Sequence, residues 1–223
     1  MNDLAQKLIE ELQCETVFTI PVLGGIPVSE AVVVAVLVIV AFILTRNLKV
    51  DHISKRQAVA ESIVTGLMNM VQGMVGEKGR KYVPYLTTVM LYIGVSNIIG
   101  LFGFKSPTKD LRVTVALALM SIILIEAAGI YHKGVKRWLH GFVEPVAIVT
   151  PINILEVVTK PLSLCMRLFG NVLGAFVIME LLKMILPVGL PVVFSLYFDI
   201  FDGLLQAYVF VFLTSLYIDE ITE

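Results

Sequence analysis

The stretch KPLSLCMRLFGNVLGAFVIMELL, residues 160–182, decides the fold class, because it is long and apolar enough to cross a membrane yet carries an arginine inside it. A spanning α-helix needs about 20 consecutive, mostly apolar residues. The whole 223-residue chain shares this character, with 57% hydrophobic and 16% charged residues and a mean hydropathy of +0.89. Soluble domains are far less apolar. We therefore expect an all-α integral membrane protein.

Three membrane-crossing helices are expected ahead of this stretch, each from an apolar run. They lie at 31–45, 82–104 and 113–131, and the first follows an N-terminal external segment at 1–30. Between the first two, apolar residues recur at helical spacing over 55–75, with charged residues beside them. This pattern predicts an amphipathic helix lying at the membrane interface rather than a span.

The remaining apolar sequence, 146–218, is divided by the PVGLP turn at 187–191 and predicts a long helical hairpin. Its second arm, from Pro191 to Tyr217, would be about 40 Å long at 1.5 Å per residue. The hydrocarbon core of a bilayer is only about 30 Å thick. We therefore expect a strongly tilted hairpin, which completes a single membrane domain of about five crossing helices.

The Lys and Arg residues of the loops predict the orientation, because basic loops stay in the cytoplasm. Most of them lie in 46–81 and 132–144. This predicts an external N-terminus and, after five crossings, a cytoplasmic C-terminus. The acidic start of the chain lacks the basic region of a signal peptide. That fits a bacterial plasma membrane, although an organelle-encoded protein would look similar.

Polar residues mark one face on each arm of the hairpin. On the first arm they are spaced i, i+4, i+7 and on the second i, i+3, i+7, so each set shares one helix face. Counting outward from the turn gives their levels, in a register that can slip by a turn while the faces stay the same. The expected pairs are Arg167 with Gln206, Asn171 with Asp202, and Gly174 with Asp199.

Arg167 needs an explanation, because a charge at the centre of a spanning helix costs at least ~2.5–3.5 kcal/mol. It could be a structural cation whose side chain reaches the interface, but its place in a polar face favours a functional role. A cation at mid-depth would attract a mobile carboxylate and keep it ionised, since an opposite charge lowers the pKa of an acid.

Three segments carry a resemblance to subunit a of the F-type rotary ATP synthases. PINILEVVTKPLSLCMRLFGNVLGAFV, residues 151–177, resembles the signature segment of that family. LLQAYVFVFLTSLYIDE, residues 204–220, is similar to its last helix, and SNIIGLFGFKSPTKDLRVTVALAL, residues 96–119, to a loop and the third span.

The resemblance implies an ion-translocating stator subunit beside a rotating ring of c subunits. Its other partners would be the b subunits of the peripheral stalk, the remaining synthase subunits and membrane lipid. Two half-channels would lead H⁺ or Na⁺ to and from a ring carboxylate, which couples ion flow to ATP synthesis. ATP chemistry would then lie on other subunits, so this chain is not expected to be an enzyme by itself.

By motif position, Arg167 would be the essential arginine facing the ring, Asn171 its neighbour on the same face, and Gln206 the glutamine opposite. Some family members carry a glutamate nine residues after the arginine, where this sequence has Phe176. Glu180, one turn later, could take over part of that role, or it could be an interface carboxylate near the outer end.

Two carboxylates of the second arm are further candidates for lining a half-channel. Asp199 stands seven residues before the glutamine, where the family carries varied ionisable residues. Asp202 is similar, although FDIFDG could also be an ordinary helix kink at Gly203.

Some polar residues on the cytoplasmic side stay open to two interpretations. Asn153, Glu156 and Lys160 lie where a second half-channel would open, and solvated helix ends explain them equally well. Glu126 could face a channel or pair with Lys133 or Lys136, residues of the basic loop.

The sequence offers no nucleotide-binding glycine loop, no Ser/His/Asp set and no metal-ligand spacing. Together with a net charge of −1, this leaves no cofactor, metal or nucleic acid among the expected ligands. The rival function is a secondary transporter or permease subunit with charges at the membrane midplane. Against it, the chain has no internal repeat, and a purely structural anchor would leave both polar faces unexplained.

Overall fold

The computed structural model describes residues 16–20, 24–46, 54–77, 79–102, 106–141, 150–185 and 189–222. Helices account for nearly all of these residues, beside one short antiparallel pair of strands, β1 (Thr16–Ile20) and β2 (Gly24–Pro27). The α-helices are α2 (Val28–Thr45), α3 (Lys55–Val75), α4 (Val83–Ile98), α5 (Leu111–Lys133), α6 (Val135–Gly141), α7 (Thr150–Ile185), α8 (Leu190–Leu196) and α9 (Gly203–Thr222). Shorter helical turns are η1 (Arg80–Tyr82), η2 (Ile99–Phe102), η3 (Pro107–Lys109) and the π-helical segment η5 (Tyr197–Asp202).

The predicted all-α membrane fold is confirmed. Within the described ranges, five helical stretches are long and apolar enough to cross a membrane. They are Lys55–Val75, Arg80–Leu101, Leu111–Lys133, Thr150–Ile185 and Val193–Thr222.

One of these five stretches differs from the five crossing helices expected from the sequence. Lys55–Val75 is included, whereas Ser29–Thr45 falls among the shorter apolar helices. The reason is that the charged residues of α3 gather in its first turns, which leaves a long apolar remainder after Glu61. The interfacial position of α3 and the crossing by α2 therefore stay predictions from the sequence.

The packing centres on α9. This helix contacts α3, α4 and α5, and α5 also packs along α7. The side chains of Phe210 and Val211 are almost fully buried in two neighbouring apolar clusters. α7 lies at the edge of the bundle, since Leu164, Cys165 and Leu168 are its buried residues. Most of its surface is therefore open to lipid or to another protein.

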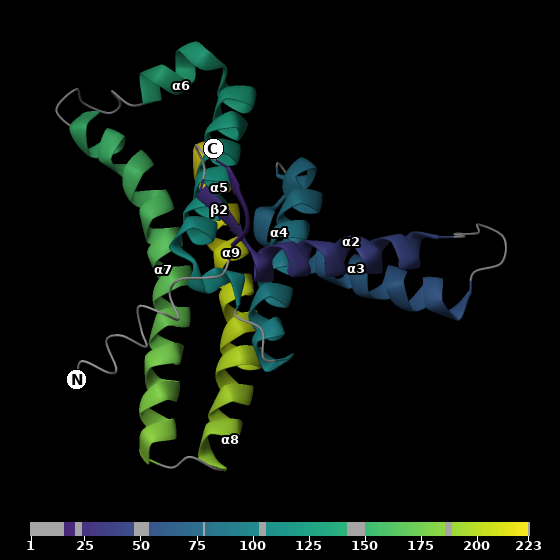
Figure 1. The fold of residues 1–223 in the computed structure, drawn as a ribbon. Helices are drawn as coiled ribbons and strands as arrows, with labels where there is room; N and C mark the ends of the chain where they lie inside the picture. The colour runs from purple at the N-terminus through teal and green to yellow at the C-terminus, as the bar shows by residue number, and fades with distance from the viewer. Residues whose placement is uncertain are drawn as a thin grey trace.

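The directions of the helices support the predicted tilt of the hairpin. In Figure 1, α2 and α3 lie side by side and run across the direction of α7 and α9. Helices that cross in this way cannot all stand along one membrane normal. α7 is also 36 residues long, or about 54 Å, so its whole length fits the hydrocarbon core only when it is strongly tilted.

Two local features hold the loop that joins α4 to α5. Asp110 caps α5, because its carboxylate accepts a hydrogen bond from the backbone N–H of Arg112 at 2.9 Å. Ser106 donates a hydrogen bond to the backbone carbonyl of Ser96 at 2.7 Å, and both residues are buried. Residues 106–110 of the loop are thereby held against the end of α4.

Candidate functional site

The two polar faces of the hairpin meet as predicted, but in a different register. Asn171 Nδ2 donates a hydrogen bond to Gln206 Oε1 at 2.6 Å, whereas Asp202 is its expected partner. The predicted pairs are therefore wrong by one turn. The expected pairs placed the centre of the turn midway between Arg167 and Gln206. The observed turn lies later, since α7 ends at Ile185 and α8 begins at Leu190, and the π-helical segment adds a further offset.

Arg167 lies on the exposed side of α7, next to the buried Leu168. Within the described parts of the chain, it takes part in no hydrogen bond, ion pair or ring contact. The predicted pair with Gln206 is not formed, since Gln206 binds Asn171 on the next turn. The arginine thus presents its charge to whatever lies beside α7.

Two glycines lie on the same side of α7 as Arg167. A Cβ atom added at Gly170 or at Gly174 would meet nothing within 4 Å. The small-xxx-small spacing of this pair is typical of close helix packing, yet no described helix of this chain covers it. We call the face formed by Arg167, Gly170 and Gly174 the arginine face.

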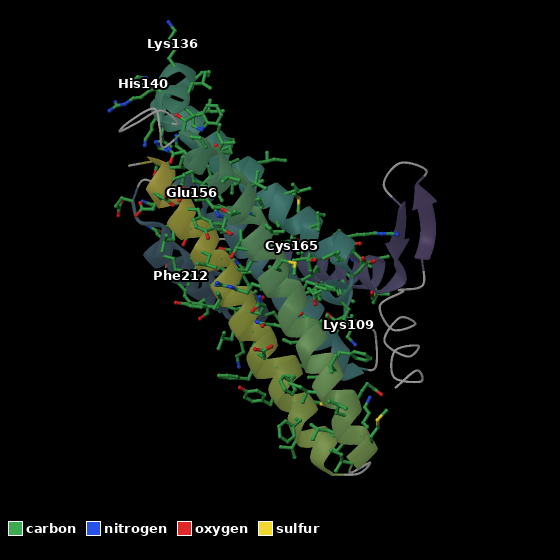
Figure 2. The ribbon with its side chains drawn as sticks, turned by 90° about the vertical axis from the view of Figure 1, so that its left-hand side faces the viewer. Lys109, Lys136, His140, Glu156, Cys165 and Phe212 are labelled. Carbon is green, nitrogen blue, oxygen red and sulfur yellow. The ribbon has the colours of Figure 1, made fainter. Side chains whose placement is uncertain are left out.

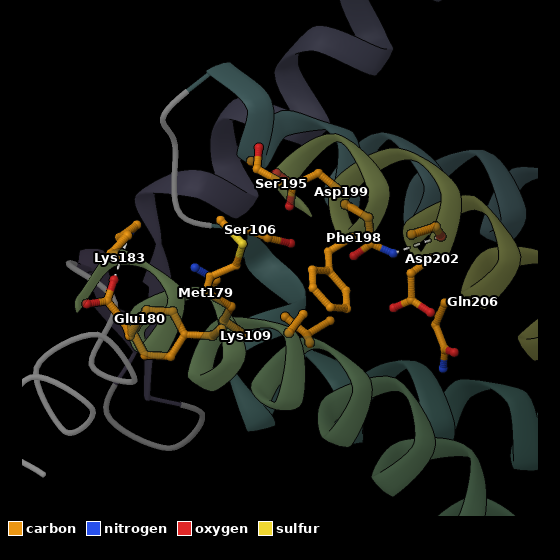
Figure 3. Close-up of a pocket in the computed structure, with 16 residues that line it drawn as sticks. Ser106, Lys109, Met179, Glu180, Lys183, Ser195, Phe198, Asp199, Asp202 and Gln206 are labelled. Carbon is orange, nitrogen blue, oxygen red and sulfur yellow. Dashed lines mark hydrogen bonds and ion pairs between the residues drawn. The ribbon is translucent and has the colours of Figure 1, made fainter. Parts of the chain in front are cut away.

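The first cavity lies near the α7–α8 turn and measures about 410 Å³. α7, η5, α9 and the α4–α5 loop enclose it, as Figure 3 shows. We call it the turn-side cavity. Its polar lining includes Lys109, Glu180, Lys183, Asp199, Asp202 and Gln206. Four of the six predicted site residues thus meet in one space, while Arg167 and Asn171 lie outside its lining.

The carboxylates of the turn-side cavity differ in their contacts. Glu180 forms an ion pair with Lys183, with 2.7 Å between the charged atoms. Asp199 lies against Gly100, where an added Cβ would come within 3.2 Å of its Oδ1. Gly100 therefore leaves room for the Asp199 carboxylate. Its role was not predicted, because a glycine in an apolar helix gives no signal about a neighbour a hundred residues away.

A buried polar network holds the wall of this cavity. Asn97 Nδ2 donates to the backbone carbonyl of Gly203 at 3.0 Å, and Thr108 Oγ1 donates to Asn97 Oδ1 at 2.7 Å. A Cβ at Gly203 would lie 2.7 Å from the Cβ of Asn97. The glycine thus permits close contact between α9 and α4. Asn97 and Thr108 were not predicted. Asn97 gave a usable signal, as a polar residue in the apolar run 82–104, whereas Thr108 lies in a polar loop and gave none.

Gln206 combines deep burial with an unused donor. Its side chain is 2% exposed; Oε1 is bound by Asn171, while Nε2 has no hydrogen-bond partner among the described residues. A buried donor without a partner costs about 1–3 kcal/mol. A group that entered the turn-side cavity beside Gln206 could recover that cost by accepting this hydrogen bond.

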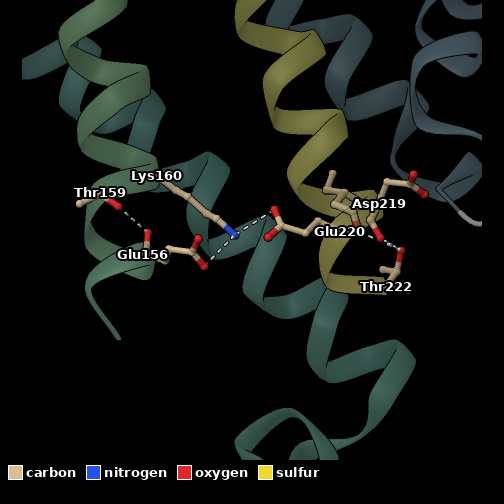
Figure 4. Close-up of polar contacts among 7 residues, drawn as sticks. Glu156, Thr159, Lys160, Asp219, Glu220 and Thr222 are labelled. Carbon is tan, nitrogen blue, oxygen red and sulfur yellow. Dashed lines mark hydrogen bonds and ion pairs between the residues drawn. The ribbon is translucent and has the colours of Figure 1, made fainter. Parts of the chain in front are cut away.

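A second cavity of about 320 Å³ lies at the opposite end of α7, and residues of α6 help to line it. We call it the α6-side cavity. Lys160 Nζ lies 3.1 Å from Glu220 Oε2 and 3.9 Å from Glu156 Oε2, as Figure 4 shows. Glu126 also lines it and accepts a hydrogen bond from Trp138 Nε1 at 2.9 Å. Glu126 is thus hydrogen-bonded to Trp138, a partner that differs from Lys133 and Lys136.

Arg167 lies between the two cavities. On α7, the turn-side cavity begins at Val172 and the α6-side cavity ends at Lys160, a gap of about 18 Å along the helix axis. Figure 2 shows this order, with Cys165 between Glu156 and Lys109. The arrangement can offer a charged group to a neighbour while keeping two polar spaces apart. Within the described residues, no group of His, Cys, Asp and Glu could hold a metal ion.

Comparison with known proteins gives a consistent result. Residues 28–219 match the family described as ATP synthase A chain. The chain is 32% identical over 201 residues to ATP synthase subunit a of Moorella thermoacetica, an alignment that covers 88% of this chain and 92% of that one. It is 34% identical over 215 residues to the sodium ion specific ATP synthase subunit a of Propionigenium modestum, which covers 87% and 74%.

A third relative, ATP synthase subunit a 1 of Crocosphaera subtropica, is 30% identical over 188 residues, with 83% of this chain and 81% of that one aligned. The family match over residues 28–219 contains the arginine face, the turn-side cavity, and all of the α6-side cavity lining except Glu220 and Ile221. This chain therefore belongs to the family of subunit a of the F-type ATP synthases, the ion-translocating stator subunits.

Proposed function

We propose that Arg167 faces a carboxylate on a neighbouring ring of c subunits, and that the two cavities are the ends of two half-channels leading to and from that carboxylate. Family membership gives the ion-translocating role and a place in the ATP synthase complex. The proposal concerns which residues of this chain perform it and how.

The proposal rests mainly on the surroundings of the Arg167 side chain. Its guanidinium is exposed on an apolar helix and has no partner within the described ranges. A cation within the membrane is stable only beside a counter-charge or water. A partner that packs on the arginine face would have to supply negative charge at this depth, and a ring carboxylate does so.

The two glycines support close approach of that partner. Gly170 and Gly174 leave open space on the same side of α7, so the backbone of a second helix can lie near the guanidinium. Small residues at such spacing allow this contact between membrane helices. Arginine suits the position better than lysine because it keeps its charge when buried.

The gap between the cavities supports two separate half-channels. No residue of α7 between Lys160 and Val172 lines either cavity. The charge of Arg167 in this gap opposes direct passage of a cation between them. An ion that enters one half-channel must then bind the ring carboxylate, travel with the ring, and leave through the other.

The remaining site residues receive supporting roles. Asp199, Asp202 and Glu180 would attract the cation into the turn-side cavity, since carboxylates in a cleft raise the local cation concentration. Gln206 would donate its free N–H to the ring carboxylate or to water beside it, and Asn171 would orient Gln206 through their hydrogen bond.

This assignment of the site residues also implies the orientation of the chain in the membrane and its partner subunits. The turn-side cavity would open outside and the α6-side cavity toward the cytoplasm of a bacterial cell, with the N-terminus outside and the C-terminus inside. The b subunits of the peripheral stalk would hold the chain against the ring. ATP would be made or hydrolysed on other subunits of the complex.

The test is ATP-driven ion transport into inverted membrane vesicles that contain the complete complex, with and without sodium and a protonophore. Arg167→Ala should abolish transport while the complex stays assembled. Arg112→Ala is the matched control, because Arg112 is exposed and lies in neither cavity lining. Full coupled transport in Arg167→Ala would overturn the proposal, and co-purification without any ring of small hairpin proteins would favour the transporter alternative.

A further inference from the structure

Lys109 brings a positive charge into the turn-side cavity from a distant part of the chain. It is the last residue of η3, half-buried, and its Nζ lies 4.9 Å from the centre of the Phe176 ring. Figure 3 shows it at the wall of the cavity, between the residues of α7 and those of η5. An ammonium group over an aromatic face is held there by the ring quadrupole.

The described segment that carries Lys109, residues 106–110, is held against α4. Ser106, Pro107 and Thr108, the three residues before it, are all buried. Thr108 Oγ1 donates to Asn97 Oδ1 at 2.7 Å, which ties η3 to α4. The ammonium is therefore a built part of the cavity wall rather than a solvent-exposed lysine that passes near it.

The charges around Lys109 leave the cavity nearly balanced. Three carboxylates and two ammonium groups line it: Glu180 and Lys183 from α7, Asp199 and Asp202 from η5, and Lys109 from η3. Glu180 and Lys183 form a direct ion pair. Lys109 acts electrostatically on Asp199. Outside the lining, its neighbour Asp110 acts electrostatically on Glu30 of α2.

Without Lys109 the lining would hold three carboxylates against one ammonium group. The formal charge of the cavity would change from −1 to −2, with both uncompensated carboxylates on η5. A cation would then enter more readily and leave more slowly, because its attraction to fixed charges in a space of low dielectric constant is strong.

We propose that Lys109 is a positioning residue that sets the affinity of the turn-side cavity for the translocated cation, and that Phe176 holds it in place for that purpose. The inference rests on the function proposed above. It assigns to the α4–α5 loop a part in ion access that the hairpin alone does not supply.

The experiment uses the complete complex in liposomes at a fixed membrane potential. The rate of ATP synthesis is measured against pH on the side to which the turn-side cavity opens, at low and at high sodium, so that either ion can be titrated. For Lys109→Gln, we expect the half-saturating ion concentration to fall roughly tenfold and the maximal rate to fall as well. Lys109→Arg should restore both values toward those of the wild type.

Two further variants keep the result decisive. Arg112→Gln removes an equal charge nearby but outside the cavity, and should leave the half-saturating concentration unchanged. Phe176→Leu removes the ring but not the charge, and should shift the concentration in the same direction by a smaller factor. If the complex with Lys109→Gln fails to assemble, the half-saturating ion concentration of Phe176→Leu tests the inference instead.

An unchanged half-saturating concentration in Lys109→Gln, or an equal shift in Arg112→Gln, would overturn the inference. So would an unchanged Phe176→Leu titration in the case where Lys109→Gln does not assemble. Failure of the underlying function is seen separately, since it would appear as retained coupled synthesis in Arg167→Ala, whatever the Lys109 variants do.

Discussion

The two cavities are built along the same helix pair, yet they hold their charges in different ways. In the α6-side cavity, Lys160 makes direct contact with Glu220 at 3.1 Å. In the turn-side cavity, no described residue lies within ion-pair distance of Asp199 or Asp202. Paired charges stabilise a helix end, whereas Asp199, which is hydrogen-bonded to Ser195 and acted on electrostatically by Lys109, has no such direct ion pair and remains available to a passing cation. The α6-side cavity therefore holds an ion pair, whereas the turn-side cavity has carboxylates that can exchange ions.

The largest effect should come from removing the charge that keeps the two cavities apart. We expect Arg167→Gln to increase passive, potential-driven ion flux through the assembled complex at least tenfold, because the cation in the gap no longer opposes direct passage. Flux is measured in liposomes without ATP. Arg112→Gln serves as the control, and a tight Arg167→Gln complex would mean that something other than this charge divides the cavities.

The next effect tests the wall of the turn-side cavity. Gly203→Ala would place a Cβ 2.7 Å from the Cβ of Asn97, so α9 must move away from α4. We expect a loss of stability of about 1–3 kcal/mol, seen as a lower midpoint of thermal unfolding. Gly73→Ala on α3 meets nothing within 4 Å and should not destabilise. Equal midpoints for the two variants would contradict the close contact at Gly203.

The third effect probes the carboxylates of η5 directly. Asp199→Asn should slow ATP synthesis roughly tenfold when the ion is limiting on the side to which the turn-side cavity opens, with a smaller effect at saturation, because one of the charges that concentrates cations is gone. This shift is opposite in direction to the one expected for Lys109→Gln. Asp219→Asn, on an exposed turn of α9 outside both cavities, is the matched control. A shift of the same size in both variants would argue against a local role for Asp199.

The smallest effect is expected at the α6-side cavity. Glu220→Gln removes the contact with Lys160, whose partner carboxylate is half exposed, and such pairs contribute about 0.2–1 kcal/mol. Transport should change by less than about twofold. The rate is compared with that of Asp199→Asn in the same vesicles. A larger loss for Glu220→Gln than for Asp199→Asn would reverse the contrast between the cavities.

Much of the fold could be predicted because it depends on helical periodicity and apolar length. The hairpin and its two polar faces follow from the spacing of Arg167, Asn171 and Gln206, which is a property of single helices. The register between the arms could not be predicted. It depends on where the turn begins and on a π-helical segment, and neither has a distinct pattern in PVGLP or FDIFDG.

The site was predictable where its residues lie on the hairpin and not where they come from elsewhere. Four of the six proposed residues line one cavity, because residues on the facing sides of two packed helices must meet. Lys109, Asn97 and Gly100 reach the same cavity from α4 and its following loop. Their contribution requires tertiary packing, which fixes how a loop near residue 109 lies against helices that follow much later in the chain.

The π-helical segment Tyr197–Asp202 also has a consequence for how this family of sequences changes over time. A π turn holds one residue more than the α turn it replaces, so losing one residue there would restore a regular helix without shortening the hairpin appreciably. Because the π turn absorbs the extra residue, the helix before it would keep its facing relative to Gln206, and only the residues of the turn itself, Asp199 and Asp202 among them, would change their facing. A one-residue gap at this point in a related sequence would therefore replace the carboxylates that face the turn-side cavity, and a small deletion would act as a change of channel lining.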